Sequence, residues 1–144
     1  MPIARISLLK GKPPAYLQAL SDSLQRALVD AFEVPPTDRF QVIHQLEANE
    51  LIFDRHYLGG PRSDDFVLIA ISAGRLRSTA TKHAFYRRLV ALLAEAPGIR
   101  PEDVMVVINT TAADEWSMSG GVPWPGTPAA PAHPAPSATP GVLP

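Results

Sequence analysis

The residue that follows the initiator methionine could do chemistry that no side chain offers. Aminopeptidases usually remove Met1 when the next residue is small, and this removal would give Pro2 a free secondary amine at its ring nitrogen. An ordinary α-amino group titrates near ~7.7–8.0, so such an amine can be tuned to act as an acid or a base near neutral pH. Pro2 is therefore a candidate catalytic residue, and the plain start of a strand is the alternative interpretation.

Two arginines that lie two residues apart could bind an anion. Arg75 and Arg77 follow an apolar run and directly precede Ser78, a plausible helix N-cap. Ligands of α/β structures often bind at such strand ends, and two planar guanidinium groups can converge on one carboxylate. The helix N-terminus beside them adds a favourable potential for an anion. The pair predicts a carboxylate-binding site, with a solvated loop as the alternative.

A carboxylate could set the charge of the terminal amine. Asp38 follows Pro35-Pro36, where aspartate commonly shapes a turn, and it precedes a strand that should begin at the same sheet edge as Pro2. Near Pro2, Asp38 would raise the pKa of the amine, whereas Arg75 and Arg77 would lower it. Asp38 is thus a candidate catalytic residue as well.

Three further side chains are candidates for substrate binding. His44 lies within a predicted strand and has no cysteine or second histidine at ligand spacing, so we expect a structural or substrate-side histidine and no metal site. Tyr57 lies in an insert before Gly59-Gly60 and could line a pocket. Trp116 follows the last predicted strand and suits packing at a subunit contact as well as a site.

A repeated pattern of elements positions these residues. One β-α-β pattern occurs twice, over about residues 2–46 and 66–109. A shift of 65 residues places Asp38 on Asp103, which favours a turn-shaping role for both, and it places Pro2 on Val67. Each unit should have a right-handed crossover and parallel strands. We therefore predict an α+β fold made of α/β-type repeats, with one four-stranded sheet and two helices on one face.

The second face of the predicted sheet needs cover. The strand residues Val42, Ile69 and Val106 suggest that this face is apolar too. The expected solution is an oligomer in which open sheet faces pack together.

Composition bounds the class of protein. The chain has 144 residues, a net charge of -1, 46% hydrophobic residues and no cysteine, which suits one compact domain without disulfides or thiol chemistry. The near-neutral charge argues against a nucleic-acid partner. No apolar run reaches the ~18–20 residues of a membrane span. We expect a soluble, cytoplasmic protein with no nucleic-acid or membrane partner.

The carboxyl-terminal part differs in composition. Eight of the 16 prolines follow Gly120. We expect a domain over residues 1–121 and an extended or disordered Pro/Ala-rich tail over residues 122–144, in which Trp124 could dock on a neighbouring surface.

In combination these features resemble the tautomerase superfamily, and within it the malonate semialdehyde decarboxylase and cis-3-chloroacrylic acid dehalogenase type. The resemblance covers about residues 2–121. It rests on Pro2 after Met1, the doubled β-α-β plan, the Pro-Pro-Thr-Asp-Arg-Phe run at 35–40, and Arg75-Leu76-Arg77. The run Asp114-Glu115-Trp116-Ser117 is similar to a Trp-Ser segment of the decarboxylase-like branch.

The resemblance implies a homotrimer with a cofactor-free site around each amino-terminal proline. In the decarboxylase, this proline, an aspartate and two arginines form the catalytic group, which here maps onto Pro2, Asp38, Arg75 and Arg77. Dehalogenase members need further polar residues that activate water, including a glutamate, and Glu115 does not fit that position. The decarboxylase-like branch is therefore favoured.

Three functional hypotheses follow. The first is decarboxylation of a small oxo acid such as malonate semialdehyde, with hydratase side activity, in which cationic Pro2 stabilises the developing negative charge. The second is keto-enol tautomerisation of a 2-oxo acid such as phenylpyruvate, with neutral Pro2 as general base. The third is a non-enzymatic small-molecule binding or assembly module. In the enzymatic hypotheses, Arg75 and Arg77 hold the substrate carboxylate.

Overall fold

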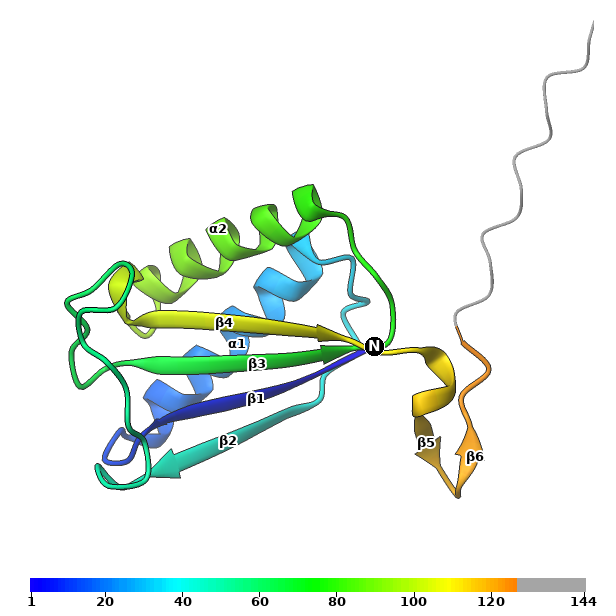
Figure 1. Cartoon of the computed structure of the whole chain (residues 1–144), viewed down its shortest axis with the longest axis horizontal. Coiled ribbons are helices and arrows are strands. Elements are labelled where there is room, and N and C mark those ends of the chain that lie inside the picture. Colours follow the sequence, from blue (N-terminus) through cyan, green and yellow to red (C-terminus); the bar gives the residue numbers. More distant parts are fainter. Residues whose placement is uncertain (127–144) are drawn as a thin grey trace, which may run out of the picture.

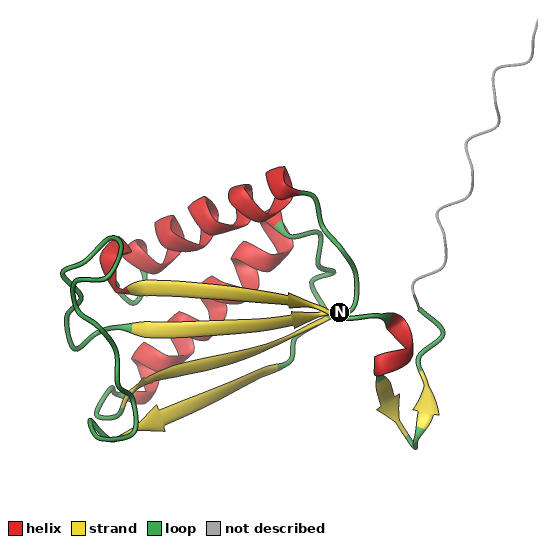
Figure 2. Cartoon of the chain, viewed as in Figure 1, coloured by secondary structure: helices red, strands yellow, loops and turns green. Residues whose placement is uncertain are grey.

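The computed structural model describes residues 1–126 and contains two β-α-β units in one layer of sheet and one layer of helices (Figures 1 and 2). The first unit consists of β1 (Pro2–Leu9), α1 (Pro14–Ala31) and β2 (Gln41–Leu46). The second consists of β3 (Val67–Ala73), α2 (Thr79–Glu95) and β4 (Val104–Thr110). The doubled plan predicted from the sequence is therefore confirmed.

The sheet has the order β2-β1-β3-β4. The outer strands run parallel to their partners within each unit, and the two units join through antiparallel pairing of β1 with β3. In this register Pro2 lies opposite Ala73, and Leu8 lies opposite Val67. The start of β1 and the end of β3 therefore lie at the same end of the sheet, which brings the amino terminus close to the loop that follows Ala73.

Both helices begin at residues that favour a helix start, and for α2 this is the N-cap predicted from the sequence. Pro14 occupies the first turn of α1, where its missing N–H leaves no hydrogen bond unmade. The hydroxyl of Ser78 accepts a hydrogen bond from Thr81 N at 3.1 Å and caps α2. The apolar stripes of both helices are buried against the sheet, with side chains of Leu20, Leu24, Leu28, Phe85, Leu89 and Leu93 in the core. No helix of residues 1–126 is long and apolar enough to cross a membrane.

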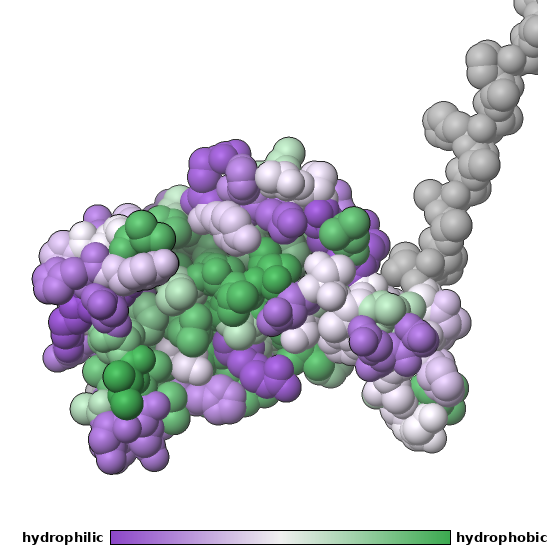
Figure 3. Space-filling model, in the orientation of Figure 1, coloured by the Kyte–Doolittle hydropathy of each residue, from purple (hydrophilic) through white to green (hydrophobic). Residues whose placement is uncertain are grey.

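The other face of the sheet is open, and its apolar residues differ from those expected. Ile69 is fully buried and Val106 packs on the same core, so both face the helices, and their predicted place on the open face is wrong. An unbroken apolar run does not show which of its alternate residues face which side. Exposed apolar side chains on the open face include Val42 (46%), Met105 (45%) and Val107 (42%). A hydrophobic area lies over the sheet in Figure 3.

A small hairpin lies beyond the end of the sheet where the chain begins (Figure 1). It consists of β5 (Ser117–Ser119) and β6 (Val122–Pro123), and Trp124 N donates a hydrogen bond to Trp116 O at 2.9 Å. The first residues of the predicted tail thus pack as part of this hairpin. The rest of that predicted tail, residues 127–144, lies outside the described residues.

The repeat partner of Asp38 has a structural role. Asp103 is fully buried, and its carboxylate accepts hydrogen bonds from Ser63 N (2.6 Å), Ser63 Oγ (2.7 Å) and Arg100 Nε (3.2 Å). Burial alone would raise the pKa of Asp103, but the hydrogen bonds from Ser63 and Arg100 outweigh it and hold the pKa below its ordinary value. Asp103 therefore fixes the insert to the start of β4.

Replacing Asp103 by asparagine tests this role. At pH 7 the Asp103→Asn variant should lose about 1–3 kcal/mol of unfolding free energy, because hydrogen bonds to a buried charged acceptor are lost. A depressed folded-state pKa contributes stability above the unfolded pKa of about 3.9, and this contribution is lost as the pH falls through the folded value. Urea unfolding at several pH values should show that the difference in unfolding free energy between wild type and Asp103→Asn becomes smaller at acidic pH.

The matched control is Asp64→Asn. Asp64 also pairs with an arginine, Arg55, but its side chain is 78% exposed. Its loss should change the unfolding free energy by less than about 1 kcal/mol. If the difference in unfolding free energy between wild type and Asp103→Asn stays constant from pH 7 to pH 3, the structural role of the Asp103 carboxylate is contradicted.

Candidate active site

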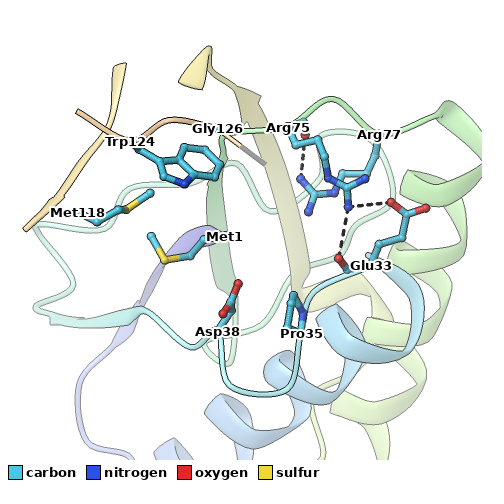
Figure 4. A pocket seen from close by; sticks show the side chains of 9 residues that line it. All are labelled: Met1, Glu33, Pro35, Asp38, Arg75, Arg77, Met118, Trp124 and Gly126. Atoms are coloured by element: carbon cyan, nitrogen blue, oxygen red, sulfur yellow. Dashed lines mark hydrogen bonds and ion pairs between the residues drawn. The ribbon is translucent and has the colours of Figure 1, made fainter. Parts of the chain in front are cut away.

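A cavity of about 420 Å³ opens at the end of the sheet where the chain begins (Figure 4). Its lining comprises Met1, Glu33, Pro35, Asp38, Arg75, Arg77, Met118, Trp124 and Gly126. Three of the four predicted catalytic residues, Asp38, Arg75 and Arg77, therefore meet beside the amino terminus. The fourth, Pro2, is buried directly behind Met1 at the start of β1.

The charges of this cavity act on the terminal amine. Burial is the largest influence and lowers the pKa of the Met1 amine below its ordinary value. The Asp38 carboxylate opposes this shift, and Arg77 and Arg75 add to it. Removal of Met1 would leave the amine on Pro2, the next residue, which lies opposite Ala73 at the same end of the sheet.

Arg77 is held rigidly against the end of α1. Its side chain is buried, and its guanidinium lies 4.4 Å from the centre of the Phe32 ring. Its Nε donates to Phe32 O at 3.2 Å, and its Nη1 donates to Arg75 O at 2.8 Å. Burial lowers the pKa of Arg77, with the Arg75 charge acting in the same direction, but a guanidinium stays protonated in proteins. Arg77 is therefore a fixed cation.

Arg75 is more exposed and pairs with a residue that the sequence analysis did not single out. Its Nη2 lies 2.9 Å from Glu33 Oε2 and 3.3 Å from Glu33 O. The dashed lines in Figure 4 mark both contacts. The two residues that follow α1, Phe32 and Glu33, thus hold the two arginines side by side at the cavity.

Asp38 reaches the cavity from a turn that is fixed from behind. Asp38 N donates to Pro35 O at 3.0 Å, and Asp38 O accepts from Gln25 Nε2 of α1 at 3.1 Å. Within residues 1–126, no donor lies at hydrogen-bond distance from the Asp38 carboxylate, in contrast to that of Asp103. The side chain of Asp38 is directed into the cavity near Met1 (Figure 4). The carboxylate is therefore available to a terminal cation.

The hairpin supplies an apolar wall. Met118 and Trp124 line the cavity opposite the arginines. Trp124 lies so close to Gly74 that a Cβ there would come within 2.7 Å of the indole ring, so a larger residue at this position would displace the ring. The indole nitrogen of Trp116 also lies close to Gly74, and it donates to Thr111 Oγ1 at 2.5 Å. Trp116 supports the wall and is not among the residues that line the cavity.

Two predicted substrate-binding residues lie elsewhere in the protomer. His44 lies opposite Ser7, midway along the outer strand β2, and is exposed on the open face. Tyr57 lies in the insert between β2 and β3, at the other end of the sheet, and is 63% exposed. Neither lines the cavity, so contact with a substrate there would require a second copy of the chain. Among residues 1–126, no group of three or more His, Asp or Glu side chains is placed to bind a metal ion.

The sequence carried one signal for Glu33 and none for Met118. An acidic residue directly after a helix is repelled by the negative end of the helix dipole. Glu33 at this position therefore indicates a nearby cation that offsets the repulsion. The position of Met118 depends on the hairpin, which consists of three-residue and two-residue strands without an apolar alternation.

Comparison with known proteins assigns a family. A family model described as a tautomerase enzyme matches residues 38–119, and a second model with the same description matches residues 2–60. The chain belongs to the tautomerase family. The protein is therefore an enzyme of the tautomerase superfamily, and the hypothesis of a purely binding or assembly module falls away.

Relatives match this chain over most of its length. It is 32% identical over 121 residues to the probable tautomerase YusQ of Bacillus subtilis (strain 168), covering 84% of this chain and 95% of the relative. A solved structure of malonate semialdehyde decarboxylase is 33% identical and superposes with a TM-score of 0.77, covering 83% of this chain and 92% of that one. A structure of FG41 malonate semialdehyde decarboxylase inhibited by 3-bromopropiolate is 28% identical, with a TM-score of 0.76 and coverages of 83% and 91%.

The two arginines of the cavity should differ in their effect on stability. Arg77→Ala should lower the unfolding free energy by about 2 kcal/mol, because a buried cation, its two hydrogen bonds to carbonyls and its stacking on Phe32 are lost. Arg75→Ala should lower it by less than about 1 kcal/mol, because the pair with Glu33 is exposed. Urea unfolding measures both changes.

Both arginine variants should bind a monocarboxylate such as pyruvate at least tenfold more weakly, because a charged hydrogen bond is worth about 1.5–3 kcal/mol. Trp124 lines the cavity, so quenching of tryptophan fluorescence can follow the binding. Equal destabilisation by the two variants, or unchanged pyruvate affinity in Arg75→Ala, would contradict this division of roles.

Proposed function

We propose that this enzyme decarboxylates a small 3-oxo acid, with malonate semialdehyde as the model substrate, and uses Pro2 as its catalytic amine. The observation that carries the proposal is the meeting of the amino terminus, Asp38 and the arginine pair at one cavity. The likeness to malonate semialdehyde decarboxylase over most of both chains supports it. No cofactor is needed for the steps described below.

Substrate binding would begin at the arginines. Arg77 is fixed by the carbonyls of Phe32 and Arg75, and Arg75 lies beside it, so a carboxylate would meet two guanidinium groups of defined position. This grip would hold the carboxylate out of the plane of the substrate carbonyl. The breaking carbon–carbon bond is then aligned with the carbonyl π system, as a near-attack geometry requires.

The amine would act on the carbonyl oxygen. When the carbon–carbon bond breaks, its electron pair enters the carbonyl system and forms an enolate, while carbon dioxide leaves. A cationic Pro2 would donate a hydrogen bond to the oxygen on which negative charge develops, so it would stabilise the transition state more than the ground state. Asp38 would favour the charged form of the amine, and protonation of the enolate carbon would complete the reaction.

A second candidate activity is keto-enol tautomerisation of a 2-oxo acid such as phenylpyruvate. The observation that favours it concerns the Met1 amine, one residue before Pro2: burial and both arginines lower its pKa, and the opposing effect of Asp38 does not reverse this direction. We expect the same influences to act on the Pro2 amine after Met1 is removed. A lowered pKa increases the neutral fraction near pH 7, and neutral Pro2 could move a proton as a general base. The probable tautomerases of Bacillus subtilis support the same activity by their names.

We further propose a homotrimer. The exposed apolar side chains of the open sheet face, among them Met105 and Val107, need a partner. A structural neighbour of the same fold, fused 4-OT, is described as a symmetric trimer, at 19% identity and a TM-score of 0.68.

Blocking the terminal amine tests the role of Pro2. A chain that retains Met1, or that carries one extra residue before Pro2, should lose at least a hundredfold in kcat, the lower range for loss of a general acid or base. Turnover of malonate semialdehyde and of the phenylpyruvate enol measures both candidate activities. Pyruvate binding, followed by fluorescence, is the control and should stay within about threefold. Undiminished turnover by the blocked chain would overturn the Pro2 mechanism.

The charge of Pro2 separates the two activities. Titration of the Pro2 nitrogen by ¹⁵N NMR should place its pKa above 7 for the decarboxylase and below 7 for the tautomerase. In either case Asp38→Asn should lower this pKa and Arg75→Ala should raise it, because the two charges act on the amine in opposite directions. The pH profile of kcat/KM should move with the measured pKa. A pKa that neither variant moves would show that these side chains do not set the charge of the amine.

A further inference from the structure

Glu33 is the acidic residue that contacts an arginine of the cavity. Its carboxylate lies 2.9 Å from Arg75 Nη2, and its side chain lines the cavity. It comes from the chain directly after α1, on the arginine side of the cavity, whereas Asp38 lies beside Met1 (Figure 4). The two carboxylates therefore serve different parts of the same site.

The type of residue at position 33 suggests a function. The φ angle of Glu33 is +57°, in the left-handed region that favours glycine and asparagine. An acidic side chain after a helix also meets the negative end of the helix dipole. The left-handed conformation itself belongs to the end of α1, because Val34 N donates to Leu28 O at 3.3 Å and the repeat counterpart Gly98 also has a positive φ, +100°. The helix end does not require an acidic side chain at this position.

The charges that line the cavity balance before the amine is counted. Arg75 and Arg77 contribute two positive charges, and Asp38 and Glu33 contribute two negative ones. Arg75 Nη2 is already engaged by Glu33, so a ligand carboxylate has the remaining nitrogens of the pair. A second ligand carboxylate reaching Nη2 would meet the Glu33 carboxylate directly, and like charges at contact distance repel.

We propose that Glu33 makes the site selective for acids with a single carboxylate, because it occupies the position on Arg75 that a second carboxylate would take. This inference rests on the proposed function, since it assumes that Arg75 and Arg77 bind the substrate carboxylate. A 3-oxo acid with one charge fits the site, whereas a diacid of the same length is rejected by repulsion from Glu33.

Two ligands that differ chiefly in charge test the proposal. Malonate carries two carboxylates near neutral pH, and its monomethyl ester carries one. The test measures the dissociation constants of both ligands by tryptophan fluorescence at pH 7.5, for the wild type without Met1 and for Glu33→Gln. The variant should bind malonate at least tenfold more tightly than wild type does and should change its affinity for monomethyl malonate by less than threefold.

A control variant removes the same charge elsewhere. Glu47 forms an exposed pair with Lys10, which the 65-residue shift places on Arg75, but this pair lies at the opposite end of β1. Glu47→Gln should leave the affinity of both ligands unchanged.

The remaining outcomes are distinct. Equal gains for both ligands in Glu33→Gln would overturn selectivity and leave a general charge effect. Losses for both would show that Glu33 orients Arg75 instead, and no change in either would remove Glu33 from the site. If wild type binds monomethyl malonate and Arg75→Ala does not weaken this binding, the carboxylate grip of the proposed function fails, whatever Glu33→Gln does.

Discussion

The antiparallel pairing of β1 with β3 is the constraint on which the site depends. It places Pro2 opposite Ala73, so the first residue of β1 and the loop with both arginines lie at the same end of the sheet. Because β2 runs parallel to β1, the turn before β2 lies at this end of the sheet as well, and this turn carries Asp38. Three segments that are distant in sequence thus converge because of strand direction alone. The helices then fix the details, since the end of α1 supplies the carbonyl oxygens that hold Arg75 and Arg77.

Much of this arrangement could be predicted from the sequence because it follows from local pattern. The doubled β-α-β order, the cap at Ser78 and the loop position of Arg75 and Arg77 each depend on a few neighbouring residues. The orientation of Ile69 and Val106 could not be predicted, because both faces of their strands are apolar. The same limit applies to Trp124, which reaches the cavity through contacts with Gly74 and Trp116 that no periodic pattern predicts. Met118 reaches the cavity from the short strand β5, which has no apolar alternation either.

The two halves of the repeat have used the same kinds of charge in different ways. At the end of the sheet away from Pro2, Asp103 is hydrogen-bonded by Ser63, and Lys12, the counterpart of Arg77, pairs with Asp65. At the Pro2 end, the carboxylate of Asp38 has no hydrogen-bond donor within residues 1–126, and Arg75 is held by an exposed pair. One end of the frame therefore satisfies its charges internally and contributes to stability. The other leaves part of its hydrogen-bonding capacity for a ligand, which is where chemistry becomes possible.

The packing of Trp124 on Gly74 also has a consequence for synthesis of the protein. The cavity is lined at one side by residue 1 and at the other by Trp124 and Gly126. During translation, the amino terminus leaves the ribosome first, while the apolar wall is added only after both β-α-β units have been made. A nascent chain that stops before Trp124 would present the amine and both arginines to water without that wall. The cavity is therefore complete only after Trp124 and Gly126 have been synthesised. Chains that end before Trp124 would lack the apolar wall of the cavity.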